Sequence, residues 1–206
     1  MDFSAEDFQW PSDEHTLFRD EAGWDSAVFT RIWSRDQWMP YATGFREAGD
    51  RLLEDLLDRG RHHDLLVYPI VFLYRHHIEL MLKFLIQDMH RMLDKDPPSK
   101  DILKTHFLRK LWGDLEGLTD EWKGRDWKSE PDAQSAARLI RELDKADPKS
   151  EMFRYPSDHD MEFLEMRSMR NAMAALCNFL EAMSLEIERQ RDFDSEMREY
   201  YSPDFY

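Results

Sequence analysis

The chain has 206 residues, enough for one domain with a substantial core, and 42% of them are hydrophobic. Seven glycines and nine prolines are too few for a sandwich or barrel of many short strands, so an all-α fold is expected. The net charge of −15 excludes a broad basic footprint for nucleic acid, although a small basic pocket is compatible with it.

The number of cysteines and the length of the apolar segments indicate the cellular compartment of the protein. Cys177 is the single cysteine, which excludes an internal disulfide, and its apolar helical neighbours favour a small buried side chain over a catalytic thiol. The acidic start, MDFSAEDFQW, lacks the apolar core of a signal peptide. The longest uncharged run, 65–74, is too short to span a bilayer and contains Pro69. We therefore expect a soluble, cytoplasmic protein with no membrane association.

Three parts are expected along the chain. An acidic, aromatic arm (1–36) precedes a helical bundle domain (37–191), and an acidic, aromatic tail (192–206) follows it. Aromatic residues are frequent in the arm, whereas disordered tails seldom carry many, so we expect the arm to pack on the body or on a second subunit.

Within the domain, apolar residues recur at helical spacing and predict a bundle of about five helices. The expected helices are 38–59, 65–94, 105–118, 132–145 and 161–191. The second is apolar nearly all round in its first half, which indicates a central, buried helix. The last carries a heptad-type seam of methionine and aliphatic residues for a neighbouring helix. Thr105 is expected to cap the third helix, and 119–131 to form a polar connection.

Charged and imidazole side chains interrupt the most apolar helix. Arg75, Glu79 and Lys83 are spaced i, i+4 and i+8, so they share one side of the helix, with His76 close to it. Burying charges is costly unless they are paired, so this row must face partners or a cleft. One interpretation is a satisfied ion ladder at the rim of the core; the other is a functional site. His77 is interpreted as a surface or packing histidine.

Two further segments carry candidate site residues. His106, at the start of the third predicted helix, either caps that helix or faces Arg75 and His76. The FRYP segment at 153–156 offers Arg154 and the aromatic Tyr155 beside a rigid turn. Arginine is the side chain that best clamps a phosphate or carboxylate.

Alternatives remain for the FRYP segment. Arg154 would otherwise cap the preceding helix or bind an acid such as Glu79. His159 lies five positions after Arg154, but Pro156 between them argues against one continuous helix.

Standard cofactor and metal fingerprints are missing from the sequence. It contains no glycine-rich phosphate loop, no CxxC pair and no HExxH. A di-iron bundle would place an ExxH pattern on two helices, and that pair is also lacking. We therefore expect neither a metal site nor a cofactor.

Four stretches together resemble a set of bacterial and phage proteins of unassigned function. They are YATGFREAGDRLLEDL, LLVYPIVFLYRHHIELMLK, the segment 105–112 and MFRYPSD, within roughly Tyr41 to Met183. The helical arrangement resembles the HEPN superfamily, whose members are all-α bundles of about five helices that dimerise. Many HEPN domains are metal-independent ribonucleases of toxin–antitoxin and phage-defence systems. The resemblance thus implies a homodimer, with RNA and an antitoxin as partners.

The HEPN signature is an arginine followed about four to six residues later by a histidine. Arg154 and His159 fit that spacing, although Pro156 lies within it, and Arg167 and Arg170 on the late helix have no histidine after them. By resemblance, the arginine would stabilise phosphate charge and the histidine would act on the ribose 2′-hydroxyl. A second catalytic arrangement would use Arg75, His76 and His106, with Glu79, Lys83 and Tyr155 in binding roles.

Two other functions are compatible with the sequence. The first is a non-catalytic module that binds a nucleotide, a nucleic-acid end or a partner protein through the same polar residues, which the acidic net charge favours. The second is an acidic interaction or inhibitor protein, in which the arms 1–36 and 192–206 would be the functional parts.

Overall fold

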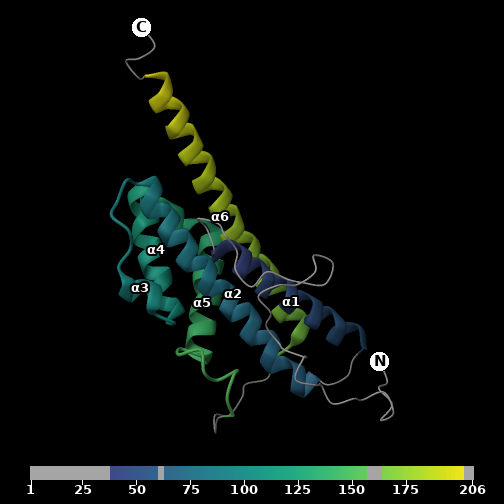
Figure 1. The fold of residues 1–206 in the computed structure, drawn as a ribbon. Coiled ribbons are helices and arrows are strands. Elements are labelled where there is room, and N and C mark those ends of the chain that lie inside the picture. The colour runs from purple at the N-terminus through teal and green to yellow at the C-terminus, as the bar shows by residue number, and fades with distance from the viewer. Residues whose placement is uncertain (1–37, 60–62, 157–163, 202–206) are drawn as a thin grey trace, which may run out of the picture. The chain divides into compact units, whose positions relative to one another are not determined.

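The computed structural model of the chain describes residues 38–59, 63–156 and 164–201, and these residues contain helices and no strand (Figure 1). The expected all-α bundle is therefore confirmed. In chain order the elements are α1 (Trp38–Arg59), α2 (His63–Met92), α3 (Lys100–Lys104), α4 (Leu108–Lys123), the 3₁₀-helix η2 (Arg125–Ser129), α5 (Pro131–Ala146) and α6 (Met166–Tyr200).

The region between α2 and α5 differs most from expectation. The helix predicted at 105–118 begins at Leu108 and continues to Lys123, and the short α3 precedes it. Ser99 caps α3 by accepting a hydrogen bond from the amide of Ile102, whereas Thr105 ends α3 and does not cap α4. The expected polar connection is largely helical as well, because buried Trp127 anchors η2 by donating to Asp120 at 2.9 Å.

The helix α2 is the central element, as predicted. It packs against α1, α4 and α6 (Figure 1), and its fully buried side chains include Ile70, Ile78, Met81, Leu82, Leu85, Ile86 and Met89. By length and composition, its stretch Leu65–Met92 meets the criterion for a membrane span, which core helices of globular proteins also meet. Within its most apolar window, 61% of the residues are buried against the rest of the protein.

The helix α6 carries the predicted seam. The seam residues Met166, Met169, Met173, Leu176, Leu180, Met183 and Ile187 are all buried, and α6 packs on α1, α2 and α5. Cys177 is also buried, as expected, and burial raises the pKa of its thiol to about 12. The helix continues to Tyr200, so most of the segment expected as a tail is helical.

Polar side chains fix α1 against α2 and α6. Gly49 lets α1 approach α2 closely, because a Cβ at this position would lie 3.4 Å from the ring of Tyr74. The Tyr74 hydroxyl donates to Asp50, and burial, with that bond, raises the pKa of Tyr74. Arg46 donates to Glu181 and, at 2.8 Å, to Asn178 on α6. These bonds orient α1, which supplies part of the surroundings of the candidate site.

Candidate functional site

Arg75 is a buried side chain that joins three segments of the chain through hydrogen bonds. Its side chain is 0% exposed. Its Nε donates to the main-chain oxygen of Asp147 at 2.9 Å, its Nη2 to that of His106 at 2.8 Å, and its Nη1 to Glu79 at 3.2 Å. Arginine has five N–H donors in a fixed fork, which suits it to join several acceptors. The guanidinium therefore ties α2 to the turn before α4 and to the loop after α5.

Glu79 is the centre of the same buried network. One carboxylate oxygen accepts from Lys83 Nζ at 2.7 Å and from His106 Nδ1 at 2.9 Å, and the other accepts from Arg75. Burial raises the pKa of Glu79, but the hydrogen bonds and charges of Lys83 and His106 outweigh it and leave the pKa below its usual range. Glu79 is therefore ionised at neutral pH, and its charge is paired with those of Arg75 and Lys83 on α2.

His106 brings this network to the protein surface. Its side chain is 58% exposed, whereas that of Glu79 is 1% exposed. An ionised carboxylate only accepts hydrogen bonds, so Nδ1 of His106 carries the hydrogen that it donates to Glu79. In the neutral imidazole, Nε2 then has a free lone pair. His106 thus joins the ladder and does not merely cap α4.

Asp147 organises the loop that follows α5, and it was not among the predicted site residues. Its buried carboxylate accepts from the amides of Glu151 at 2.8 Å and Met152 at 3.2 Å, and lies 3.5 Å from Arg75 Nε. An aspartate directly before Pro148 is a common turn signal, so the sequence did carry a hint of this role.

A second group of side chains lies next to the buried network, around Phe72. The rings of Phe72 and His76 are stacked at 5.7 Å, and the guanidinium of Arg154 lies 5.9 Å from the centre of the same Phe72 ring. Arg154 also lies over the ring of Tyr155 at 5.4 Å and donates to the main-chain oxygen of Ser150. The four side chains Phe72, His76, Arg154 and Tyr155 are called the Phe72 patch below.

The electrostatics of His76 differ from those of an exposed histidine. Phe45 of α1 meets its ring edge-on at 4.4 Å. Burial lowers the pKa of His76, and Lys83 and Arg75 lower it further against the opposing effect of Glu79. The imidazole is therefore neutral at pH 7, so it is available as a hydrogen-bond acceptor or a proton acceptor.

The predicted site residues thus fall into two adjoining groups. Arg75, Glu79, Lys83 and His106 form one hydrogen-bonded network. His76, Arg154 and Tyr155 belong to the Phe72 patch, and Phe72 itself was missed, although its position four before His76 puts both on one side of α2. His159 lies outside the described residues.

His77 has a structural position. It was expected at the surface or in packing, and it is buried. Its Nδ1 donates to the main-chain oxygen of Ala42 at 2.8 Å, and its Nε2 has no hydrogen-bond partner among the described residues. Burial lowers the pKa of His77. It therefore holds α1 against α2 as a neutral side chain.

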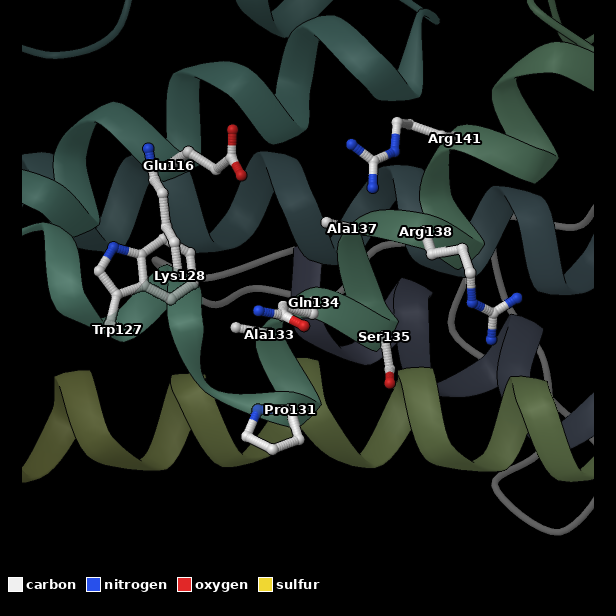
Figure 2. Close-up of a pocket in the computed structure, with 10 residues that line it drawn as sticks. All are labelled: Glu116, Trp127, Lys128, Pro131, Ala133, Gln134, Ser135, Ala137, Arg138 and Arg141. Atoms are coloured by element: carbon white, nitrogen blue, oxygen red, sulfur yellow. The ribbon is translucent and has the colours of Figure 1, made fainter.

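A hollow of about 630 Å³ lies elsewhere in the structure, between α4, η2 and α5 (Figure 2). None of the predicted site residues lines it. In the described part of the chain, no group of three or more histidine, cysteine, aspartate or glutamate side chains is arranged to hold a metal ion.

Comparisons with protein-family models, with curated proteins and with solved structures found no match to this chain. The fold over 38–59, 63–156 and 164–201 defines an all-α helical bundle. Its candidate site combines a buried ion network with an aromatic and cationic surface patch.

Proposed function

We propose that the chain is a HEPN-like module that binds single-stranded RNA at the Phe72 patch. The observation that carries the proposal is that the Phe72 ring contacts both an imidazole, His76, and a guanidinium, Arg154. Proteins that bind single strands combine aromatic rings, on which bases stack, with cations that meet the phosphates.

The side chains of the patch suit separate parts of a nucleotide. Tyr155 is 62% exposed and offers a ring for base stacking. Arg154 presents a planar donor group, which pairs with phosphate oxygens in a bidentate manner. His76 is neutral because its pKa is lowered by burial, so it accepts a hydrogen bond from a 2′-hydroxyl, the group that distinguishes RNA from DNA.

The buried network supports this patch without contacting RNA. Arg75 fixes the loop after α5 at the carbonyl of Asp147, and Arg154 lies seven positions further along that loop. Arg75 also immediately precedes His76 on α2. Because its donors are directed at carbonyls and at Glu79, we assign Arg75 a positioning role and not a phosphate-binding one.

The acidic net charge limits how this module binds RNA. At −15 the chain repels a long phosphate backbone, so binding has to depend on a few local contacts. Each phosphate contact on a single strand contributes a slope of about −0.7 to log K against log salt. A patch with one arginine therefore predicts a slope near −0.7, far shallower than that of a basic RNA-binding protein.

Fluorescence anisotropy with a labelled RNA of about 12 nucleotides tests the proposal. We expect Arg154→Ala to weaken binding by about tenfold, because it removes the phosphate contact. The matched control is Arg51→Ala, an exposed arginine on α1 that pairs with Glu47 at 3.3 Å, and it should change binding less than about twofold. Equal RNA binding by wild type and Arg154→Ala would exclude the Phe72 patch as the RNA-binding site.

A metal-independent endoribonuclease is a second candidate, favoured by one observation. The pKa of His76 is held below its ordinary value by burial, so the imidazole suits a general base, and the cationic Arg154 lies near the same Phe72 ring. By resemblance to HEPN domains, the active form would be a homodimer. RNA cleavage in the presence of EDTA that His76→Ala abolishes would support this function. Intact RNA after prolonged incubation with wild type would exclude cleavage and leave RNA binding as the only proposed function.

A further inference from the structure

The side chains that line the hollow between α4, η2 and α5 include more cations than carboxylates, although the chain as a whole is acidic. The lining includes three cationic side chains, Lys128, Arg138 and Arg141, and one carboxylate, Glu116. The chain as a whole carries −15. A local excess of positive charge in so acidic a protein attracts small anions, while the remaining surface repels long polyanions.

The three cations differ in whether an acidic side chain pairs with them. Lys128 is paired with Asp120 at 2.8 Å and Arg138 with Glu142 at 2.7 Å. Among the described residues, Arg141 has no ion-pair partner. In Figure 2 its guanidinium points from α5 toward the middle of the view, above Ala137. Arg141 is therefore the cation most available to a ligand.

The other walls of the hollow are apolar or belong to the start of a helix. Trp127, Ala133 and Ala137 provide apolar surface, and Pro131 begins α5. The cap residue Glu130 makes no side-chain hydrogen bond to the first turn of α5. Pro131 has no N–H and the amide of Gln134 donates to the main-chain oxygen of Glu130, so only the amides of Asp132 and Ala133 in this turn have no partner within the helix. The helix dipole adds positive potential there, which the carboxylate of Asp132 in the same turn partly offsets.

We propose that this hollow binds a small phosphate-bearing ligand of about mononucleotide size. Arg141 meets the phosphate, Arg138 and Lys128 add positive charge, and Trp127 with the alanines contacts the less polar part of the ligand. The volume of about 630 Å³ falls in the range of roughly 300–1,000 Å³ that is typical of small-molecule sites. Arginine forks favour phosphate oxygens because two parallel hydrogen bonds form at once.

This site is independent of the proposed RNA-binding function. No residue of the Phe72 patch lines the hollow, and Arg141 makes no contact with that patch in the described structure. Variants of the two sites therefore test the two proposals separately, and one proposal can fail while the other stands.

The probe is AMP, with adenosine as the uncharged control, in calorimetric titrations of the full chain. We expect AMP to bind and adenosine not to bind detectably. Arg141→Ala should weaken AMP binding by about tenfold or more, the size expected for losing a charged hydrogen-bonding partner. Arg138→Ala should weaken it less, because Arg138 is partly neutralised by Glu142. The matched control, Arg51→Ala at an exposed pair on α1, should bind AMP like wild type.

Arg141 and Arg138 are exposed on α5, so their alanine variants are expected to fold, and far-UV circular dichroism checks this. Absence of AMP binding to wild type would overturn the proposal. So would AMP binding that survives in the Arg138→Ala, Arg141→Ala double variant. AMP binding that is lost in Arg154→Ala and kept in Arg141→Ala would assign the phosphate to the Phe72 patch and would overturn the proposal as well.

Discussion

The guanidinium of Arg75 and the main-chain carbonyl of Asp147 are 72 positions apart in the chain and are joined by a 2.9 Å hydrogen bond in the interior. Through this bond the central helix holds the loop that carries Arg154. A charge that would be costly in an apolar helix is stabilised here by carbonyls and a carboxylate. The same side chain therefore serves the fold and positions the candidate site.

Replacing Arg75 should unfold much of this arrangement. Arg75→Met removes the partner of Glu79 and of the main-chain oxygens of Asp147, His106 and Pro148. Breaking a buried pair in this way costs about 3–5 kcal/mol. Urea unfolding followed by circular dichroism measures the loss. Arg51→Ala, at an exposed pair, should change stability by less than about 0.5 kcal/mol. If Arg75→Met lowered the free energy of unfolding by less than about 1 kcal/mol, the structural role of Arg75 would be contradicted.

Glu79 should make the protein sensitive to acid. Its folded pKa lies below the ordinary 4.5 because Lys83 and His106 outweigh the effect of burial. The unfolded chain then binds the proton more readily, so the stabilisation is complete above pH 4.5 and is lost as the pH falls through the folded pKa.

Unfolding free energies measured from about pH 6 down to about pH 3 check this dependence. Glu79→Gln should show a shallower acid slope than wild type, although it is less stable at pH 7. Glu188→Gln, at an exposed carboxyl on α6, serves as the control and should keep the wild-type slope. Equal slopes for wild type and Glu79→Gln would remove Glu79 from the explanation.

His77 should add a pH dependence at higher pH. Burial lowers its pKa below the ordinary 6.5, so below pH 6.5 the unfolded chain takes up a proton that the folded protein resists. Stability should therefore decrease as the pH falls from 6.5 toward the folded pKa, by at most about 1.4 kcal/mol per pH unit for one proton. The pKa of His76 is lowered in the same way, so His77→Leu should reduce the slope of stability against pH without abolishing it. An unchanged slope would count against a buried, neutral His77.

Gly49 should tolerate only a small side chain. An added Cβ would lie 3.4 Å from the Tyr74 ring, at van der Waals contact. Gly49→Ala therefore fits, gains helix propensity and should stay within about 1 kcal/mol of wild type. Gly49→Leu should lose about 1–3 kcal/mol by overpacking. Gly44→Leu is the matched control in the same helix, since a Cβ there meets no described atom within 4 Å. Thermal unfolding of the three variants measures the difference, and equal melting temperatures for the two leucine variants would contradict the close approach.

Helix positions were predictable where apolar periodicity is strong. The first helix was predicted at 38–59 and spans Trp38–Arg59, and the methionine seam of α6 is buried as expected. The prediction was wrong at η2, because the polar composition of 119–131 outweighed the signal of one anchoring tryptophan, Trp127. Burial of a single ring against Asp120 is a tertiary interaction that periodicity does not report.

The candidate site was predictable only in part. Helical spacing places Arg75, Glu79 and Lys83 on one side of α2, and costly burial required partners for them. Spacing does not identify those partners when they are main-chain carbonyls, as at Asp147 and His106. The hollow was not predictable from the sequence either, because Lys128, Arg138 and Arg141 resemble ordinary solvated charges there.

The most direct test of RNA binding at the Phe72 patch is an NMR titration of the histidine ring protons with single-stranded RNA. We expect the ring signals of His76 to shift in a saturable way, because the imidazole is stacked on the Phe72 ring, near which Arg154 also lies. The signals of buried His77, bonded to Ala42, should stay in place and serve as the internal control. A titration in which RNA binds while the His76 signals do not move would contradict the assignment.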